Sequence, residues 1–260
     1  MLTGERRRET QRLLRARGEL EYVWLAEHFG VSEMTARRDI DALEAAGEAR
    51  RVLGGAISVV SRRHEPPVGE RELAGREAKE QISAAAAALV RPGDSIFLDA
   101  GTTATAFAGR LAMLDIDLLV VTPNLRAAIA LSESDSIRVI VTGGLIRRQE
   151  HSLVGADAER TVRGYNVDTA FVGAAGVHLE RGLTDYGLEE AEVKRLAIAR
   201  ASRVVALADS SKIGHVSLCE ICPASDIDVL VTDAPEDDPV LQAMRQAGTE
   251  VICTEPEQAT

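Results

Sequence analysis

The first 46 residues place apolar side chains at helical spacing in short segments that are separated by Gly18 and Gly30. Apolar residues that recur every three or four positions form one face of a helix, and glycine commonly ends one. We therefore expect one helix within residues 4–18 and a second within residues 21–30. Their inward faces are expected to be Leu13 and Leu14 in the first helix, and Val23, Ala26 and Phe29 in the second.

A third helix is expected to follow and to lead into a hairpin. Ser32 can act as its N-cap, because a serine hydroxyl accepts a hydrogen bond from an amide of the first helical turn. The helix is expected to run to about Ala46 and to end at Gly47. Beyond it, EARRVLGGAISVV carries alternating and β-branched residues around Gly54-Gly55, which predicts a small two-stranded wing.

The hydrophobic pattern changes in the second part of the chain. An alanine-rich helix, EAKEQISAAAAALV, is followed by short apolar runs that alternate with helical segments: SIFLD, DLLVV, IRVIVT, TAFVG, VVALA and DVLVT. Alternating strands and helices predict an α/β domain with a mainly parallel sheet covered on both faces. Between the two patterns, SRRHEPPVGERE is charged and contains Pro66 and Pro67, as a linker would. The expected organisation is a winged helix-turn-helix domain at 1–58, a linker at 59–75 and an α/β domain at 76–260.

Composition narrows the class of protein without deciding its function. The 260 residues are 45% hydrophobic and 27% charged, which is ordinary for a globular protein. No apolar run approaches the roughly 20 residues that a membrane-spanning helix needs, so no membrane partner is expected. The N-terminal MLTGERRRETQ lacks the apolar run of a secretory signal. The three cysteines do not form a disulfide framework, which fits a reducing cytoplasm.

Charge is unevenly distributed along the chain. Residues 1–63 contain 12 arginines, no lysine and 10 acidic residues, a net charge of +2, whereas the whole chain carries −11. The remaining residues therefore carry −13. A slightly basic head on an acidic body is typical of a protein in which the head alone contacts a polyanion.

The third expected helix carries a pattern typical of DNA binding. On a helical wheel, Ala36, Ile40 and Leu43 lie on the inward side. Two short helices joined by a glycine turn form a helix-turn-helix, whose second helix enters the major groove. There an arginine can bind a guanine or a phosphate. The expected DNA-binding residues are Ser32, Met34, Thr35, Arg37, Arg38, Arg50 and Arg51.

The alternative is an exposed helix on which Arg37–Asp41 and Arg38–Asp41 ion pairs merely add solubility. Three helices in this order, the wing arginines and the arginine bias of this end of the chain favour DNA binding.

The segment YVWLAEHFGVSEMTARRDIDALEAAGEARRVLGGA resembles the N-terminal signature of the DeoR family of bacterial transcriptional regulators. The matching positions are Leu25-Ala26, Val31-Ser32, Thr35, Arg37-Arg38-Asp39, Leu43-Glu44, Gly47, Arg51 and Gly54-Gly55-Ala56. Three positions depart from the pattern. Ala36 stands where the family usually has Ile, Leu53 where it often has His, and Thr10 where it usually has an apolar residue. Ala36 and Thr10 are expected to loosen packing slightly, and Leu53 to remove one polar DNA contact from the wing.

In the second domain, nearly every expected strand ends in a loop of small polar or charged residues. Ligands of open parallel sheets bind at the carboxyl ends of the strands. The AGTT sequence before a helix offers backbone amides and hydroxyls that suit a phosphate. The candidate cations are Arg147, Arg148, Lys194 and Lys212, and the candidates for binding sugar hydroxyls are Asp99, Asn124, Asp185 and Asp209.

Each of these residues also has a plain structural explanation. Gly143-Gly144 can be a tight turn, Arg148 can be a solvated charge, and Lys194 can be a helix-surface charge paired with Glu190. The recurrence of polar loops at the same end of successive strands favours a binding site.

The resemblance to the DeoR family continues through DAGTTATAFAGRL, VVTPNLRAAIAL, VTGGLIRR, DTAFVGAAGV, GLTDYGLEEAEVKR and ALADSSKIG. It implies an effector domain similar in fold to ribose-5-phosphate isomerase, and a repressor, dimeric or tetrameric, that responds to a phosphorylated sugar or related metabolite. The effector-binding residues that it implies, with Asp185 from the sugar-binding candidates, are Asp99, Gly101, Thr102, Thr103, Asn124, Gly143, Gly144, Arg147, Gly176, Asp185, Lys194, Asp209 and Lys212. Pro123 stands where many members have Asn.

Two other functions deserve comparison. A sugar-phosphate isomerase needs a carboxylate base and a cation beside the carbonyl, roles open to Glu189, Glu190 or Asp185 with Lys212. This alternative leaves the head unexplained. A metal or redox site at Cys219 and Cys222 lacks a second ligand pair of suitable spacing, although His215 and Cys253 are also present. We therefore expect no catalytic residue, metal or cofactor, and a double-stranded DNA operator as the partner.

Overall fold

The computed structural model describes residues 3–17, 19–46, 49–58 and 65–254. The chain divides into two units, residues 1–64 and residues 65–260, which we call the head and the sensor. The head has one hydrophobic core, and the sensor has two that lie on opposite faces of its main sheet. No helix of the described residues is long and apolar enough to cross a membrane.

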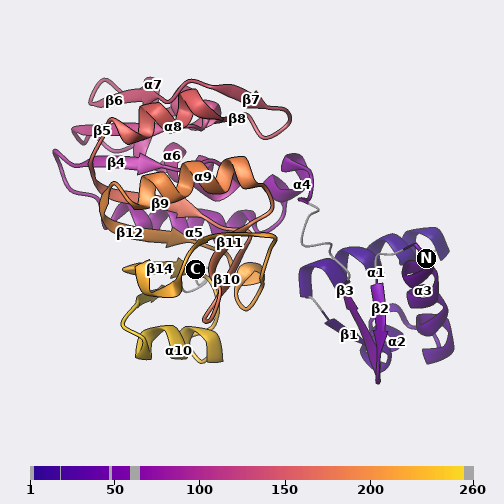
Figure 1. Ribbon diagram of the computed structural model, residues 1–260. Coiled ribbons are helices and arrows are strands. Elements are labelled where there is room, and N and C mark those ends of the chain that lie inside the picture. Colours follow the sequence, from indigo (N-terminus) through magenta and orange to yellow (C-terminus); the bar gives the residue numbers. More distant parts are fainter. Residues whose placement is uncertain (1–2, 18, 47–48, 59–64, 255–260) are drawn as a thin grey trace. The chain divides into compact units, whose positions relative to one another are not determined.

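The head contains three helices and a small antiparallel sheet, with the strand order β1-β3-β2 (Figure 1). The elements are α1 (Thr3–Arg17), β1 (Glu19–Glu21), α2 (Tyr22–Phe29), α3 (Glu33–Ala45), β2 (Ala49–Val52) and β3 (Gly55–Ser58). The three expected helices and the expected wing, β2 with β3, are thus confirmed. Strand β1 was not expected, because three residues are too few to show an alternating pattern. The expected helix ends at Gly18 and Gly47 lie outside the described residues.

The buried face of α2 is the expected one only in part, because Ala26 and Phe29 pack against the core of the head as expected but Val23 does not. Val23 is 54% exposed, whereas Tyr22 and Leu25 are buried. An eight-residue helix makes little more than two turns, so apolar side chains on it fit more than one face. Contacts of α2 with α3 and β1 decide which face is covered.

Two of the departures from the family pattern, Thr10 and Leu53, have clear places in the head, as does the matching Gly55. Thr10 is buried in α1, and its hydroxyl donates to the carbonyl of Arg6 at 2.9 Å, so its polar group is satisfied inside the helix. Gly55 of the wing approaches β1 closely, because a Cβ atom there would lie 2.2 Å from the carbonyl oxygen of Leu20. Leu53 is fully exposed in the turn between β2 and β3.

The sensor is built on a seven-stranded sheet with the order β15-β14-β12-β9-β4-β5-β6, in which every neighbouring pair is parallel. Its strands are β4 (Ser95–Leu98), β5 (Leu118–Thr122), β6 (Ile137–Val141), β9 (Val167–Gly173), β12 (Ala201–Leu207), β14 (Val229–Thr232) and β15 (Glu250–Cys253). The six expected strands and the α/β class are confirmed, and β15 is an addition.

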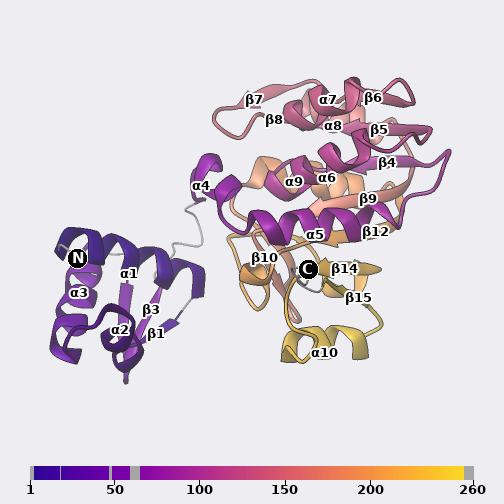
Figure 2. The ribbon, with the colours of Figure 1, turned by 180° about the vertical axis from the view of Figure 1, so that it is seen from behind.

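Helices cover both faces of this sheet. One face packs against α5 (Arg76–Ala87), α6 (Thr102–Ala112) and α7 (Leu125–Ser132), and the other against α8 (Ala156–Arg163), α9 (Leu188–Ile198) and α10 (Pro239–Gln246). Figure 1 shows α8 and α9 in front of the sheet, and Figure 2 shows α5, α6 and α7. Within β4, Phe97 points to one core while Ile96 and Leu98 point to the other, since successive side chains of a strand alternate.

Shorter elements complete the sensor. They are α4 (Val68–Leu73), the hairpin of β7 (Leu145–Arg147) with β8 (Ser152–Val154), the antiparallel strands β10 (Gly176–His178), β11 (Gly182–Asp185) and β13 (Cys219–Cys222), and two 3₁₀ turns, η1 (Ser210–Lys212) and η2 (Ala224–Asp226). Helix α4 lies inside the segment expected to be linker, of which residues 59–64 lie outside the described residues.

Candidate DNA-binding face and effector site

Helix α3 has the features of a recognition helix. Ser32 caps it, since the Ser32 Oγ accepts a hydrogen bond from the Thr35 amide at 3.3 Å. Ala36, Ile40 and Leu43 are buried, as the helical wheel predicts. Met34, at 60% exposed, lies on the outward side of the first turn.

Two of the four candidate arginines are held by carboxylates of the head itself. Arg37 bonds Glu33 Oε1 through Nε at 3.1 Å and Nη2 at 2.6 Å, and its guanidinium lies 4.6 Å from the ring centre of Tyr22. Arg51 of the wing pairs with Asp41 at 2.8 Å and with Glu44 at 2.7 Å. Asp41 therefore pairs with Arg51 and not with Arg37 or Arg38, so the pairs considered from the sequence are wrong.

Arg38 and Arg50 are exposed, and neither side chain has an ion pair with another described residue. Residues four apart are neighbours on a helix, so Met34 and Arg38 lie on the same outward strip of α3. That strip presents one cation and one apolar side chain to solvent. These groups match a guanine edge or phosphate and a thymine methyl, respectively.

The third residue of the Arg-Arg-Asp motif has a structural place that the sequence analysis missed. Asp39 is buried and accepts hydrogen bonds from Arg6 Nε at 2.5 Å and from Arg7 Nε at 3.1 Å. It therefore joins α3 to α1. An acidic residue on the same helical face as Ala36 and Leu43 was the available signal, because a charge on a buried face needs a partner.

In the sensor, a buried ion-pair cluster lies at the carboxyl ends of the strands. Lys194 of α9 contacts Asp99, which follows β4, at 2.8 Å, and Asp185, the last residue of β11, at 2.7 Å. The Lys194 ammonium also donates to the carbonyl of Gly173 at 3.0 Å, and the Gly173 amide donates to Asp99 at 2.9 Å. The fold thus brings together three expected effector residues that lie far apart in the sequence.

Lys194 is not the helix-surface charge considered as its alternative explanation, since it is only 6% exposed. Burial alone would lower the pKa of Lys194, but the charges of Asp185, Asp99 and Glu190 outweigh burial and raise the pKa. The lysine is therefore a permanent cation. Burial raises the pKa of Asp99, with the charge of Lys194 opposing it.

The loops after β4 and β5 lie next to this cluster. Asn124 caps α7 by accepting from the amides of Arg126 and Ala127, each at 3.1 Å, and its amide donates to Thr105 of α6 at 2.9 Å. Thr105 in turn bonds the carbonyl of Gly101. Gly101, Thr102 and Thr103 form the start of α6 and are partly exposed, so their amides and hydroxyls are open to a ligand.

Arg147 and Glu190 extend the polar edge toward the β7–β8 hairpin. Arg147 forms an ion pair with Glu190, and Ser152 of β8 donates to the other oxygen of Glu190 at 2.6 Å. Burial raises the pKa of Glu190 to about 7, while the charge of Lys194 opposes this rise. Glu190 was considered for the isomerase alternative and as a surface partner of Lys194, but not as an effector-site residue, and Ser152 was missed.

Asp209 and Lys212 occupy the turn after β12. The Asp209 carboxylate accepts from the Ser211 amide at 3.0 Å and so caps η1, which ends at Lys212. Lys79 of α5 is close enough to Asp209 for their charges to interact. Burial lowers the pKa of Lys79, and the charge of Asp209 opposes this effect. Lys79 lies on the same helical face as the buried Ile82 and Ala86, and this break in an apolar face could have marked it.

The candidate glycines have roles in backbone packing. A Cβ atom at Gly144 would lie 2.5 Å from the carbonyl oxygen of Val154, and one at Gly176 would lie 2.4 Å from that of His215. Gly143 and Gly144 both have positive φ, at 74° and 108°, as a tight turn requires. These contacts give Gly144 and Gly176 structural reasons to be glycine that need no ligand.

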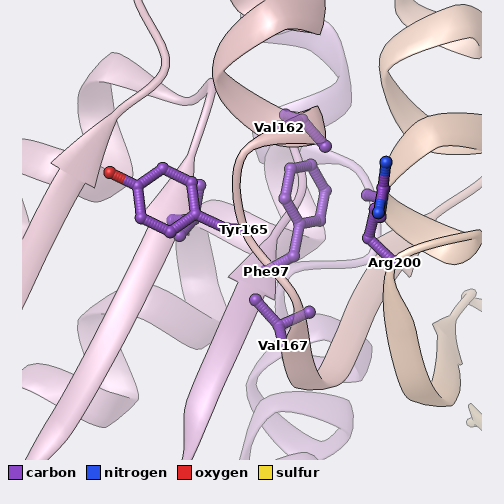
Figure 3. Close-up of a pocket in the computed structure, with 7 residues that line it drawn as sticks. Phe97, Val162, Tyr165, Val167 and Arg200 are labelled. Carbon is purple, nitrogen blue, oxygen red and sulfur yellow. The ribbon is translucent and has the colours of Figure 1, made fainter.

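One surface hollow of about 180 Å³ lies away from the polar edge (Figure 3). Phe97, Val162, Tyr165, Val167 and Arg200 line it, with Val121 and Ala197. Val167 begins β9 and Arg200 immediately precedes β12, so the hollow lies toward the amino ends of the strands. The hollow is open to solvent and too shallow to enclose a water molecule, so it is not a candidate small-molecule site.

The cysteines show no grouping with other metal ligands. Among the described residues, no three His, Cys, Asp or Glu side chains are grouped as a metal site requires. Cys222 belongs to a hydrophobic core, and burial raises the pKa of its thiol to about 12, so it carries almost no reactive thiolate at neutral pH.

A winged helix-turn-helix head with an outward arginine, joined to an α/β unit with a polar strand edge, defines the class of DNA-binding transcriptional regulators with a sensor domain. Family models give the same result: residues 6–62 match a DeoR-like helix-turn-helix domain, and residues 75–234 match a DeoR C-terminal sensor domain. The chain belongs to the DeoR family. The expectation from its sequence motifs is confirmed.

Individual relatives align over nearly the whole chain. The putative aga operon transcriptional repressor of Escherichia coli O157:H7 is 34% identical over 96% of this chain and 93% of the relative. The HTH-type transcriptional regulator GlpR of Haloferax volcanii is 35% identical over 97% and 98%, respectively. The repressor GlcR of Bacillus subtilis is 33% identical over 88% and 87%. These relatives are regulators, and this chain is a regulator and not an enzyme.

Among solved structures, ribose 5-phosphate isomerase A from Methanocaldococcus jannaschii aligns over 54% of this chain and 55% of that chain, with 21% sequence identity and a TM-score of 0.41.

Proposed function

We propose that this regulator represses a carbohydrate-metabolism operon and that a phosphorylated sugar or related metabolite, bound at the carboxyl edge of the sensor sheet, changes its affinity for the operator. The observation that carries the proposal is the cluster of Lys194 with Asp99 and Asp185 beside the open start of α6. Fixed carboxylates suit sugar hydroxyls, and helix amides suit a phosphate.

Operator binding is the task of the head, and its arginines divide into two groups. Arg38 and Met34 contact base edges in the major groove, and Arg50 contacts a phosphate from the wing. Arg37 and Arg51 are held against Tyr22, Asp41 and neighbouring carboxylates, so they position α3 and the wing. Ser32 and Thr35, at the start of α3, lie where amides and hydroxyls reach a backbone phosphate.

The regulator acts as a homodimer or homotetramer in the cytoplasm, where its operator DNA is. Two heads related by symmetry match an operator with two half-sites. An effector can regulate only if it binds one arrangement of the heads more tightly than another. Light scattering at the concentration used for DNA binding measures the number of chains, and a strictly monomeric protein would contradict this part of the proposal.

The test is fluorescence anisotropy on a labelled duplex taken from upstream of the protein's own transcription unit. Protein is titrated at one fixed salt concentration, because affinity for DNA depends steeply on salt. Sugar phosphates are then added in parallel with the matching free sugars. We expect one phosphorylated sugar to reverse specific binding while its free sugar does not.

Two controls separate the parts of the proposal. A shuffled duplex of equal length shows how much binding is sequence-specific. Specific binding that no phosphorylated compound alters would retain the regulator and reject the sugar-phosphate effector. If a metabolite released DNA while the measured affinity of the protein for DNA stayed the same, the coupling mechanism would be contradicted.

A further inference from the structure

An unassigned group of ion pairs lies on the segment that begins the sensor. The carboxylate of Glu65 bridges two guanidiniums, with Oε1 2.9 Å from Arg71 Nη2 and Oε2 2.6 Å from Arg147 Nη2. Arg71 also pairs with Glu150, and Arg147 also pairs with Glu190. The five charged side chains therefore alternate in sign along one connected chain of contacts.

These side chains are largely covered, unlike ordinary surface ion pairs. The exposed fraction of the Glu65 side chain is 12%, and those of Arg71 and Arg147 are 17% and 28%. Arg71 is fixed further by a hydrogen bond from its Nε to the carbonyl of Pro66 at 3.0 Å. Both guanidiniums are therefore held by other partners, whereas Glu65 contacts them as an ion pair and its buried Oε2 accepts no hydrogen bond from the described residues.

The group is continuous with the polar edge of the sensor. Glu190 accepts a hydrogen bond from the Ser152 hydroxyl. The backbone of Ser152 forms an isolated β-bridge with Asn124, the cap of α7. The carbonyl of Arg71 accepts from buried Lys79 at 2.8 Å, so the segment of α4 is also anchored to α5. The point between Arg71 and Arg147 thus belongs to the same surface as the proposed effector site.

One carboxylate is in excess at this point, since three carboxylates share two guanidiniums, and covered charges without full pairing are costly. Glu65 is the carboxylate that can leave while Arg71 keeps Glu150 and Arg147 keeps Glu190 as partners. Two converging arginines form the arrangement that binds a phosphate through several charge-assisted hydrogen bonds. A phosphate ester carries about −1.5 to −2 charges at neutral pH, against one for a carboxylate.

We propose that Arg71 and Arg147 form an anion subsite of the sensor, that Glu65 occupies this subsite in the ligand-free protein, and that the phosphate of an effector displaces Glu65. This inference rests on the proposed function and adds to it one binding residue, Arg71, and an internal competitor, Glu65; Arg147 is already among the expected effector-binding residues. Glu65 directly follows residues 59–64, through which the chain connects to the head. Displacement of its carboxylate therefore releases the end of the connection from the sensor.

The test measures binding of inorganic phosphate to the full-length protein by isothermal titration calorimetry, without DNA. Glu65→Gln keeps the shape of the side chain but removes its charge, so we expect phosphate to bind at least tenfold more tightly than to the wild type. Glu72→Gln is the matched control, because Glu72 lies in the same segment and pairs with Arg126, and its substitution should leave phosphate affinity unchanged. Arg147→Gln in the Glu65→Gln background should abolish the gain.

A second variant keeps the test decisive if Glu65→Gln folds poorly. Glu65→Asp retains the charge on a shorter side chain that cannot reach both guanidiniums, and it should give an intermediate gain in phosphate affinity. Equal phosphate affinity of Glu65→Gln, Glu65→Asp and the wild type, or no binding at all, would overturn the inference. If sugar phosphates still released the wild-type protein from its operator, the proposed function would survive that result. If phosphate bound as expected but no sugar phosphate affected operator binding, the subsite would stand and the proposed function would fail.

Discussion

Adjacent arginines of α3 have opposite surroundings. Arg37 is bonded to Glu33 and stacked near Tyr22, whereas Arg38 has no ion pair with another described residue. Since a side chain that is already paired must give up its partner to bind DNA, the two arginines are expected to differ in function. Arg38 should determine sequence preference, and Arg37 should mainly hold α3 in place.

Replacement of Arg38 by Ala should therefore lower discrimination between operator and non-operator DNA by about 1–3 kcal/mol, because a bidentate contact to guanine contributes about that much. Selection from a randomised duplex library measures the effect at each position of the operator. Arg37→Ala is the comparison and should weaken binding without changing the preferred sequence. A preferred sequence that changes with Arg37→Ala and not with Arg38→Ala would reverse the assignment.

Glu190 makes the stability of the sensor depend on pH. Burial raises its pKa in the folded protein to about 7, above the 4.5 of an exposed glutamate. The folded state therefore holds this proton more tightly than the unfolded state does, so this residue's contribution to the free energy of unfolding falls as the pH rises from about 4.5 to about 7.

Glu190→Gln should remove this contribution to the pH dependence. Urea unfolding at several pH values between 5 and 8 gives the difference in free energy of unfolding between variant and wild type, and the variant should gain relative stability as the pH rises. Glu80→Gln serves as the control, because Glu80 forms an exposed pair with Arg76. A difference that stays constant across this range would show that Glu190 does not titrate as inferred.

At the scale of elements, the head is held together by an ion pair in addition to its apolar core. Asp39 of α3 is buried against Arg6 and Arg7 of α1, while Leu14 and Ile40 form part of the core between the same helices. The helices are short, so their stability depends on such tertiary contacts more than on intrinsic helix propensity.

Asp39→Ala should destabilise the head by about 3–5 kcal/mol, because it leaves a buried guanidinium without its carboxylate. We expect the variant to lose operator binding at temperatures at which the wild type still binds. Fluorescence anisotropy of the labelled operator, measured as a function of temperature, detects this loss. Glu9→Ala removes an exposed pair with Arg12 of the same helix and should cost no more than about 1 kcal/mol. Similar losses for the two variants would argue against a structural role for Asp39.

At the scale of the whole molecule, the two units have separate hydrophobic cores. A unit with its own core can unfold in its own cooperative transition. The stability of each unit can therefore be lowered separately by a substitution in its own core.

Ile40→Ala should lower the melting temperature of the head alone, since truncation of a fully buried isoleucine costs about 2–5 kcal/mol. Ile82→Ala, also fully buried, is the reciprocal change in the sensor. Scanning calorimetry of the two variants should show different transitions moving. A single transition that both variants shift equally would mean that the units unfold together.

Much of the fold follows from local patterns. Helices α1, α3 and α5 and the six expected strands follow from hydrophobic spacing, which depends on neighbours within a few positions of the chain. Strands β1, β7, β8 and β10 have three residues each, too few to display a period, so the sequence did not predict them. Val23 was wrongly expected on the inward face of α2 for the same reason.

The candidate sites were partly predictable. Asp99, Asp185 and Lys194 were named from loop chemistry and family resemblance, and the structure brings them into contact. Lys79 and Glu65 were missed, because a charged residue in a helix or a linker is ordinarily exposed. Their burial depends on elements that are distant in the sequence.

The sequence by itself determined the two-part organisation, the class of each part and the family, because periodicity and motifs are properties of short segments. Only the tertiary structure decided which charges are available. It left Arg38 exposed while pairing Arg37, and it placed Lys194 between Asp99 and Asp185. The physical reason is that the pairing of a charge depends on the order of strands and the packing of helices. Neither of these is encoded in the spacing of residues near that charge.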